Sequence, residues 1–205
     1  GLPHLFGWEE GELPPEWVQD FNRHLRGITT MSHYVRKVLI DNGVTVPQSV
    51  SGVGVDHWER VTPDPSFEPP FERSGFAFLH VSSCFPRKGV DVLLRAFGKA
   101  FTCDDDVSLI IKTFPNPHNN VRELLESERA AQRSYPDVVL IEEDLSDGRL
   151  KSLMLCCDAL VAPSRGEGFG LPIAEAMLSG LPVIATAYGG HMDFCDADKA
   201  WLVDF

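Results

Sequence analysis

From residue 76 onward, short apolar runs alternate with segments of helical spacing. The apolar runs are continuous and rich in Val, Ile and Phe, which is typical of strands buried on both faces; they lie at Phe76–Val81, Val107–Ile111, Val138–Ile141, Ala159–Ala162 and Val183–Ala185, with a weaker one at Trp201–Val203. The helical segments are Val90–Phe101, Val121–Ser134, Asp147–Cys157 and Pro172–Ser179. This alternation predicts βαβ units and therefore an α/β fold with a doubly wound parallel sheet.

Residues 1–75 have a more irregular pattern, with a Pro/Glu/Trp-rich opening. A short strand is predicted at Gly27–Thr30, and Ser32 is expected to cap a helix over Tyr34–Asp41. A second apolar run lies around Thr45–Val55. The prolines that follow indicate an exposed connector. We therefore predict one unit over residues 1–61, a linker over 62–75 and the α/β domain over 76–205.

Composition narrows the classes of protein. The 205 residues are 43% hydrophobic and 23% charged, which is ordinary for a globular chain, and 18 Lys+Arg against 30 Asp+Glu give a net charge of −12. That acidic balance argues against non-specific nucleic-acid binding. No apolar stretch reaches the ~20 residues of a transmembrane helix. Five cysteines without a C-x-x-C pair predict reduced thiols in a cytoplasmic protein. Without an initiator Met or a signal-peptide pattern, the chain reads as a fragment.

The loop before the helix at Pro172 has the most informative composition, P-S-R-G-E-G-F-G-L-P at 163–172. Its glycines allow close backbone approach to a ligand, and the first turn of the following helix offers free N–H groups to an anion. Two carboxylates, Glu167 and Glu175, could accept hydroxyl groups from the vicinal diols of a ribose and a hexose. The alternative is a turn with a solvated Glu167 and a Glu175 that complements the helix dipole. We favour the ligand site because no requirement of the fold explains three glycines and two acids there.

Two other loops at the carboxyl ends of predicted strands add candidates. Arg87 and Lys88 precede a helix N-terminus, where cations are unfavourable unless an anion lies between them. A diphosphate is the expected guest, and two solvated surface cations are the alternative. Gly189 and Gly190 permit close approach to the same phosphates. His191 is as readily structural as a contact residue.

Several residues have weaker signals. Lys112 ends a strand on the expected ligand side, although a snorkelling lysine explains it equally well. An acidic turn at 142–144 could lie beside a nucleobase, although solvation explains any single member better. Two D-x-D-like segments, Asp104–Asp106 and Asp196–Asp198, precede strands and so lie on the opposite sheet edge. We therefore expect no metal site in either. Leu171 occupies the last glycine position of G-x-G-x-x-G, so this is not a dinucleotide fingerprint.

The motifs E-G-F-G-L-P-I-A-E-A-M, S-G-L-P-V-I-A-T and P-R-K-G-V-D-V-L-L-R-A-F resemble those of the family 4 retaining glycosyltransferases of GT-B fold. The segment I-T-T-M-S-H-Y-V-R-K-V-L is similar to the end of that family's first domain. The resemblance covers roughly residues 28–205. It implies a Rossmann-like donor lobe, truncated at its C-terminus, with a remnant of the N-terminal acceptor lobe at 1–61.

The resemblance also implies roles for individual residues. Arg87, Lys88 and Glu167 would act on the donor diphosphate and the transferred sugar, with no metal and no cofactor. Glu175 would hold the ribose. The remaining donor contacts would come from Gly166, Gly168, Phe169, Gly170, Leu171, Gly189 and Gly190.

The expected partners are a nucleotide-sugar donor, a saccharide or lipid-linked acceptor, and the missing lobe of a longer enzyme. We expect the fragment to bind donor weakly and to transfer nothing alone. Two alternatives stay open, a non-catalytic nucleotide-sugar-binding module and another GT-B enzyme such as a nucleotide-sugar epimerase. The sequence names neither the base, the sugar nor the acceptor, and nothing in it supports peripheral membrane association.

Overall fold

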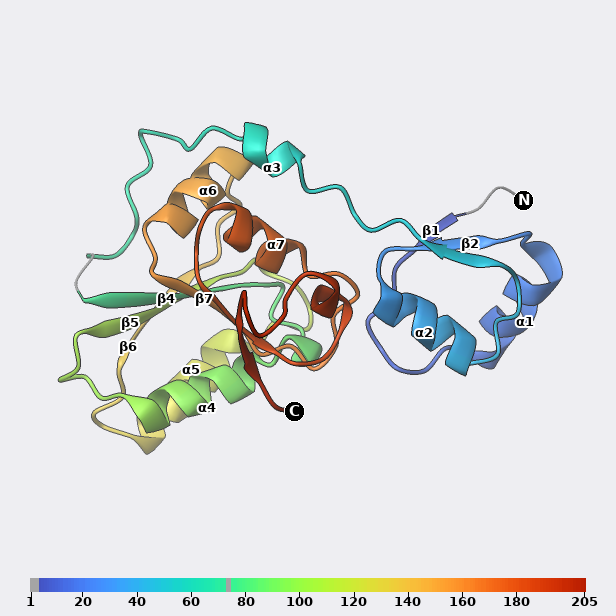
Figure 1. The fold of residues 1–205 in the computed structure, drawn as a ribbon. Coiled ribbons are helices and arrows are strands. Elements are labelled where there is room, and N and C mark those ends of the chain that lie inside the picture. The colour runs from blue at the N-terminus through green and yellow to red at the C-terminus, as the bar shows by residue number, and fades with distance from the viewer. Residues whose placement is uncertain (1–3, 73–74) are drawn as a thin grey trace.

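The computed structural model describes residues 4–72 and 75–205, which two parallel sheets organise (Figure 1). The larger sheet runs in the order β6-β5-β4-β7-β8-β9, and every pair is parallel. Its strands are β4 (Phe76–Val81), β5 (Val107–Lys112), β6 (Asp137–Ile141), β7 (Ala159–Ala162), β8 (Val183–Thr186) and β9 (Trp201–Val203). The predicted α/β parallel sheet is confirmed.

Helices cover both faces of this sheet. In Figure 1, α4 (Val90–Ala100) and α5 (Val121–Ala131) lie on one face, and α6 (Asp147–Leu155) and α7 (Leu171–Leu178) lie on the other. Each face therefore has its own apolar core, which buries Leu94 and Leu125 under the first pair and Leu153 and Ile173 under the second. Strand order reverses between β4 and β7. Ligands of doubly wound sheets bind at such a reversal, outside the carboxyl ends of the strands.

A smaller sheet is formed by the N-terminal residues, in the parallel order β1-β2-β3. Its elements are β1 (His4–Phe6), α1 (Pro15–His24), β2 (Ile28–Thr30), α2 (His33–Asp41) and β3 (Gln48–Val50). Ser32 caps α2 as predicted, because its hydroxyl accepts a hydrogen bond from the Val35 amide at 3.2 Å. The sequence analysis missed β1 and α1. A three-residue strand is too short to show periodicity, and α1 buries none of its residues.

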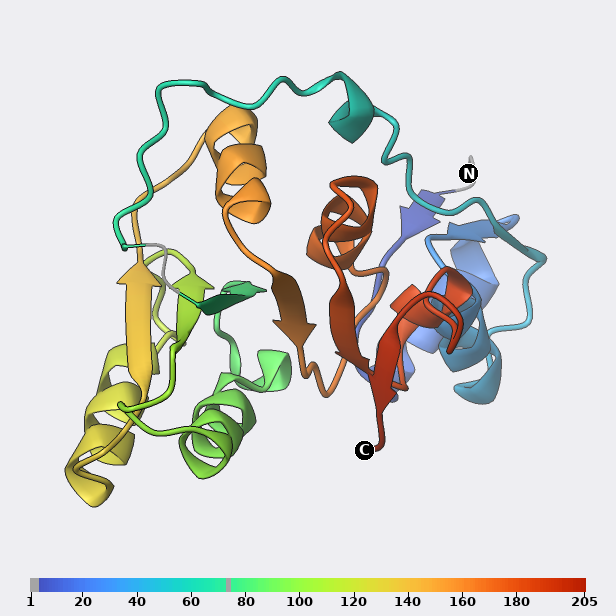
Figure 2. The same cartoon turned by 60° about the vertical axis from the view of Figure 1, so that its left-hand side comes forward.

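The segment after β3 crosses to the α6 and α7 face of the larger sheet through α3 (His57–Arg60), as Figures 1 and 2 show. Trp58 is only 1% exposed there, and its indole N–H donates to the Ser179 hydroxyl at 2.9 Å. The Lys151 ammonium donates to the carbonyl oxygens of Trp58 and Val61 at 2.7 and 2.9 Å. Within the predicted linker, the Asp64 amide donates to the Gly148 carbonyl oxygen at 3.1 Å and the Ser152 hydroxyl donates to the Asp64 carbonyl oxygen at 3.0 Å, so its first part is fastened to α6. Residues 73–74 of the linker lie outside the described residues. The domain boundaries themselves stay a prediction.

Candidate active site at the carboxyl edge of the larger sheet

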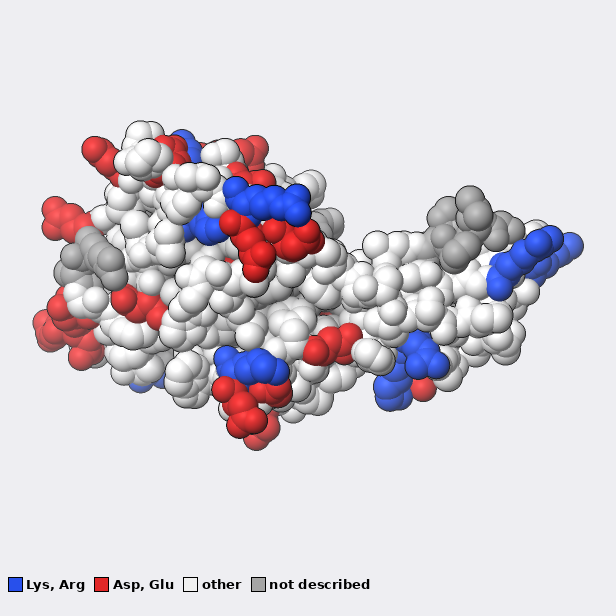
Figure 3. All heavy atoms as spheres, turned by 45° about the horizontal axis from the view of Figure 1, so that its top comes forward, with Lys and Arg blue, Asp and Glu red and all other residues white. Residues whose placement is uncertain are grey.

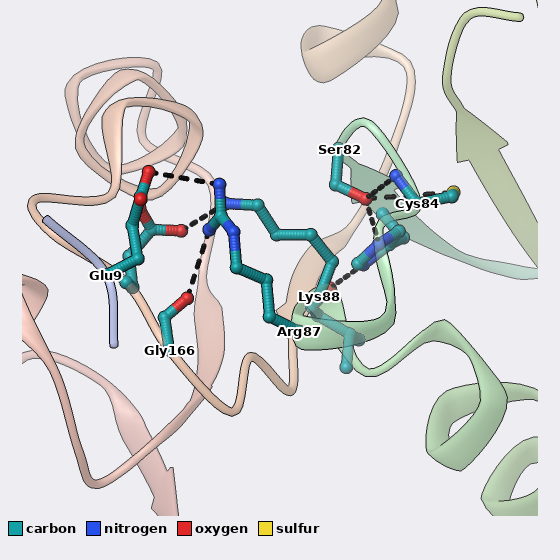
Figure 4. Close-up of polar contacts among 9 residues, drawn as sticks. Glu9, Ser82, Cys84, Arg87, Lys88 and Gly166 are labelled. Carbon is teal, nitrogen blue, oxygen red and sulfur yellow. Dashed lines mark hydrogen bonds and ion pairs between the residues drawn. The ribbon is translucent and has the colours of Figure 1, made fainter. Parts of the chain in front are cut away.

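Arg87 lies in a short 3₁₀ turn, η1 (Pro86–Lys88), between β4 and α4. Its guanidinium donates to the Gly166 carbonyl oxygen at 3.1 Å and to the Glu9 carboxylate at 3.0 Å (Figure 4). Gly166 belongs to the loop after β7, whereas Glu9 follows β1 of the small sheet. Arg87 therefore joins the predicted phosphate loop, the glycine loop and the N-terminal unit at one point.

Lys88 and Glu167 form a second pair, with 2.5 Å between the ammonium nitrogen and a carboxylate oxygen. Their side chains are only 13% and 11% exposed. Removing two charges from water is costly, and a low-dielectric pair of this kind is weak evidence for stability by itself. We therefore interpret the pair as a candidate for function, in agreement with its place beside the glycine loop.

Arg165 holds the two loops together. Its backbone N–H donates to the Arg87 carbonyl oxygen at 2.7 Å, and its guanidinium makes a two-pronged pair with Asp91 at 2.8 and 2.7 Å. This hydrogen bonding lowers the pKa of Asp91. Gly89 has a φ of +70°, and a Cβ there would lie 2.0 Å from the Pro163 carbonyl oxygen. The two loops are therefore in close contact, which fixes the backbone from which the Arg87 and Lys88 side chains extend.

The glycines of the loop after β7 have a structural explanation that the sequence analysis did not find. A Cβ on Gly166 would lie 2.4 Å from the Glu9 carbonyl oxygen, and one on Gly168 would lie 2.8 Å from that of Trp8. A Cβ on Gly190 would lie 1.8 Å from the Gly168 carbonyl oxygen. The expectation that no requirement of the fold explains these glycines was therefore wrong. They let the N-terminal unit and the loop after β8 approach the glycine loop.

The loop after β8 completes this cluster. The Gly190 N–H donates to the Glu167 carbonyl oxygen at 2.6 Å, and Gly189 has a φ of +123°. His191 is fully buried, and one ring nitrogen, Nε2, lies 2.7 Å from the Thr186 carbonyl oxygen. Burial lowers the pKa of His191, which favours a neutral ring that donates through Nε2. Among the described residues its other nitrogen, Nδ1, has no hydrogen-bond partner.

Phe169 and Leu171, near the end of the glycine loop, differ in how their side chains are packed. The Phe169 ring packs on Phe194 at 5.2 Å between centroids, and Leu171 is 40% exposed at the start of α7. Phe169 is thus anchored by a protein contact. The Leu171 side chain remains accessible.

The buried His80 fixes the start of the loop after β4. His80 Nδ1 lies 2.8 Å from the Val161 carbonyl oxygen, and Nε2 lies 2.7 Å from the Ser82 hydroxyl. The same hydroxyl accepts the Cys84 N–H at 3.0 Å, where Cys84 has an unusual φ of +53°. Burial lowers the pKa of His80 to about 4. The ring is therefore neutral at physiological pH and can accept the Ser82 proton.

Glu175 does not share the pairings of Lys88 and Glu167. It is half-buried on α7, and the charges that act on it are those of His57 and Asp147. Burial raises the pKa of Glu175 to about 7. Within the described part of the chain its carboxyl group makes no hydrogen bond. The two acids therefore have different surroundings: Glu167 is paired with Lys88 in the loop before α7, whereas Glu175 lies within α7, near His57 and Asp147.

Two cavities lie along this edge. The larger, of about 670 Å³, is lined by residues of both units: Glu9, Glu10, Gly11, Tyr34, Cys84, Pro86, Arg87, Val90, Asp91, Asn120, Leu124, Arg165, Gly166 and Tyr188. The smaller, of about 260 Å³, is lined by Val81, Ser82, Ser83, Lys112, Thr113, Phe114, Asp144, Leu145, Leu150 and Pro172. Glu175 follows Pro172 by three residues and so shares its side of α7.

The sequence analysis missed the residues that the N-terminal unit brings to the site. Glu9 pairs with Arg87, and the Tyr34 ring meets that of Tyr188 at 5.2 Å. The Tyr34 hydroxyl also donates to the Glu9 carbonyl oxygen at 3.3 Å, and burial raises the pKa of Tyr34 well above its usual range. A prediction of β1 would have placed Glu9 just after a strand end and exposed this signal.

The two aspartate segments have local partners. Asp105 accepts hydrogen bonds from the Thr102 amide and hydroxyl at 2.8 and 3.0 Å, and Asp196 pairs with Lys199. In residues 4–72 and 75–205, no group of three or more His, Cys, Asp or Glu side chains is placed to hold a metal ion. No helix in the same ranges is long and apolar enough to cross a membrane. Figure 3 shows Lys and Arg side chains beside Asp and Glu on the face in view.

Comparisons with known proteins agree with this architecture. The model of the family described as Glycosyl transferases group 1 matches residues 65–205. A similar protein is the MMP alpha-(1->4)-mannosyltransferase of Mycolicibacterium hassiacum, 30% identical over 79% of this chain and 37% of its own length. Another is the D-inositol 3-phosphate glycosyltransferase of Thermomonospora curvata, 31% identical over 64% of this chain and 32% of its own.

Solved structures show the same fold. The sucrose-phosphate synthase of Thermosynechococcus elongatus superimposes with a TM-score of 0.75 at 19% identity, over 93% of this chain and 49% of that one. Anabaena Alr3699/HepE, solved in complex with UDP-glucose, gives 0.74 at 22% identity, over 91% and 52%. The chain thus spans about half the length of these solved proteins, and only about a third of the curated relatives. Because the family model covers more than half of it, the chain belongs to the Glycosyl transferases group 1 family.

Proposed function

We propose that this chain is the donor-binding half of a retaining glycosyltransferase of family 4, which transfers a sugar from a nucleoside-diphosphate sugar to an acceptor hydroxyl. One observation carries the proposal. Arg87, Lys88, Glu167 and the glycine loop converge at the strand reversal of the larger sheet, where a doubly wound fold binds its ligands. Membership of the Glycosyl transferases group 1 family supports the reaction class.

The diphosphate would lie against Arg87, Lys88 and the N-terminus of α7. When the bond between sugar and phosphate breaks, negative charge grows on the leaving diphosphate, and these fixed positive groups stabilise it in the transition state. They supply the positive charge that a metal ion supplies in other phosphate sites, so we propose that transfer is metal-independent. The acceptor hydroxyl would attack on the face from which the diphosphate leaves, which retains the configuration of the sugar.

The two acids would have distinct tasks. Glu167, beside Lys88, would accept hydroxyl groups of the transferred sugar, and Glu175 would accept the ribose diol. The half-buried Glu175 carboxyl has no hydrogen-bond partner in the described residues, so two hydroxyl donors would satisfy it. The backbone at Gly168, Phe169, Gly170, Gly189 and Gly190 would approach the sugar and phosphates.

The larger cavity is where we place the acceptor. It borders Arg87 and Gly166, so a molecule within it would present a hydroxyl near the donor. Its tyrosines, carboxylates and Asn120 suit a hydroxyl-rich saccharide, whether free or carried on a lipid. Glu9 would then lie between the donor diphosphate and the acceptor.

The proposal is tested by calorimetric titration of the 205-residue chain with UDP-, GDP- and ADP-sugars. At least one should bind, and Glu175→Ala should weaken each of those that bind about tenfold, because the ribose is common to all. Equal affinities of the variant and the wild type would show that Glu175 does not bind the ribose. Failure of every member of the panel to bind would contradict the proposed function.

Assays with the longer protein separate the alternatives. A glycosylated acceptor with retained configuration is the expected product, and transfer by residues 1–205 alone is not expected. Free nucleotide with an altered sugar would instead indicate an epimerase. Binding without either product would indicate a sensing module.

A further inference from the structure

The smaller cavity has two opposite charges on its wall and apolar side chains around them. Lys112 ends β5, and Asp144 lies in the loop between β6 and α6. Val81, Leu145 and Leu150 supply the apolar part. An apolar cavity with a few convergent polar groups is the usual form of a small-molecule site.

The Lys112 ammonium group is fixed by one hydrogen bond and has further N–H donors. Its side chain belongs to a residue that is 8% exposed, and its ammonium donates to the Thr113 carbonyl oxygen at 2.7 Å. An ammonium group has three donors, and that bond uses one of them. The position of the charge is therefore fixed by the protein, while part of its hydrogen-bonding capacity remains for a ligand.

Asp144 differs from the neighbouring acid Glu142. Glu142 pairs with Arg122 on α5. Asp144 is exposed and, in residues 4–72 and 75–205, makes no side-chain hydrogen bond and no ion pair within 4.0 Å. Among the charges that oppose the burial-induced fall in the pKa of Lys112, that of Asp144 is the largest. The carboxylate thus lies near the ammonium but remains available to a ligand.

We infer that this cavity binds the guanine base of the donor, with the Asp144 carboxylate accepting the N1–H and N2–H groups and Lys112 donating to O6. The inference rests on the proposed function and names its donor as a GDP-sugar. A carboxylate is the one side chain that can accept two parallel donors from this edge of guanine.

The other bases fit this pair of charges less well. Uracil presents a single N–H between two carbonyl oxygens, which a carboxylate repels. Adenine presents an N–H₂ group beside the lone pair of N1, which it also repels. Guanine alone offers two adjacent donors next to an acceptor, matching Asp144 and Lys112 together. The cavity volume of about 260 Å³ admits a purine ring system.

The test is equilibrium titration of the 205-residue chain with GDP, UDP and ADP at one salt concentration. We expect GDP to bind at least tenfold more tightly than UDP and ADP, because only guanine can make the two-point contact with the Asp144 carboxylate. Asp144→Asn should weaken GDP about tenfold or more and UDP less than twofold. Glu143→Gln is the matched control, since it removes one charge next to Asp144 but outside the cavity lining, and it should keep the GDP preference.

The outcomes separate the two proposals. UDP or ADP binding more tightly than GDP, or an unchanged preference in Asp144→Asn, would overturn the base assignment and leave the proposed function standing. Absence of binding by all three nucleotides would overturn both.

Discussion

The two ends of the candidate site differ in whether their charged groups have partners within the protein. At the loop end, each cation already has a carboxylate of the protein: Arg87 has Glu9, Lys88 has Glu167 and Arg165 has Asp91. At the helix end, along α7 and the smaller cavity, the carboxyl groups of Glu175 and Asp144 make no hydrogen bond with the described residues.

This difference indicates how each end meets a ligand. The ion pairs of the loop end form without a ligand, so an incoming diphosphate has to compete with the carboxylates for the cations. At the helix end, the half-buried Glu175 carboxyl is desolvated without a compensating hydrogen bond, whereas the Asp144 carboxylate is exposed. A ligand there meets acceptors that it does not have to take from another group of the described residues. Within the loop end, substitutions should therefore change ligand affinity most at the buried Lys88–Glu167 pair and least at the more exposed Arg87–Glu9 pair. At the helix end, substitution of Glu175 should also change the free energy of unfolding.

Lys88→Met should have the largest effect. We expect the affinity of the 205-residue chain for a nucleoside diphosphate to fall about 100-fold in calorimetry. Two causes add. The charge-assisted contact to phosphate is lost, and Glu167, whose side chain is only 11% exposed, is left as an unpaired anion beside the ligand.

The second cause can be isolated. Lys88→Met with Glu167→Gln should recover part of the affinity, since the repelling charge is gone. Lys99→Met, at the exposed last turn of α4, serves as the control and should bind like the wild type. Equal affinities for the single and double variants would show that Glu167 does not repel the ligand.

Glu175→Gln should have an intermediate effect, visible as a pH dependence of the free energy of unfolding. Burial raises the pKa of Glu175 to about 7 in the folded protein, above its unfolded value. The ionised carboxylate therefore destabilises the fold as pH rises from about 4.5 to 7, and the neutral amide does not. The raised pKa would lower the free energy of unfolding by about 3 kcal/mol in full. Partial solvent access of the carboxyl group reduces this loss to about 1–2 kcal/mol.

Denaturant unfolding measured at pH 4 and pH 8 checks this sign. The variant should match the wild type at pH 4 and exceed it at pH 8. Glu126→Gln on the exposed surface of α5 is the control and should follow the wild-type curve within about 0.5 kcal/mol. A variant less stable than the wild type at pH 8 would mean that Glu175 stabilises the fold.

The larger sheet was predictable because its information is local. Each buried strand is a continuous apolar run, and loops at the carboxyl ends are identified by strand direction alone. For the same reason Arg87, Lys88 and Glu167 could be grouped from the sequence, and the structure brings them together with Gly166.

The rest depended on contacts between segments far apart in the chain. Glu9 reaches Arg87 across 78 positions, and the Ser32 hydroxyl donates to the Gly168 carbonyl oxygen at 2.6 Å across 136. The periodicity of apolar residues along the chain carries no information about such packing. The glycines were misjudged for this reason, since the backbone that requires them comes from Trp8 and Glu9. Helix phase placed Glu175 on α7 but could not identify the elements, α3 and α6, whose charges act on it.

Glu9→Gln should have the smallest effect, in the opposite direction to that of Lys88. Glu9 and Arg87 are 41% and 26% exposed, so their pair is worth about 0–1 kcal/mol. Releasing Arg87 from this competitor should raise the affinity for a nucleoside diphosphate by at most about fivefold, and less at high salt, where the pair is screened. Titration at two salt concentrations measures it, with Glu12→Gln on the same loop as the control. A fall in affinity would instead mean that Glu9 itself contacts the nucleotide. The loop end would then be completed by the N-terminal unit, and its ion pair would no longer be a rival to the ligand.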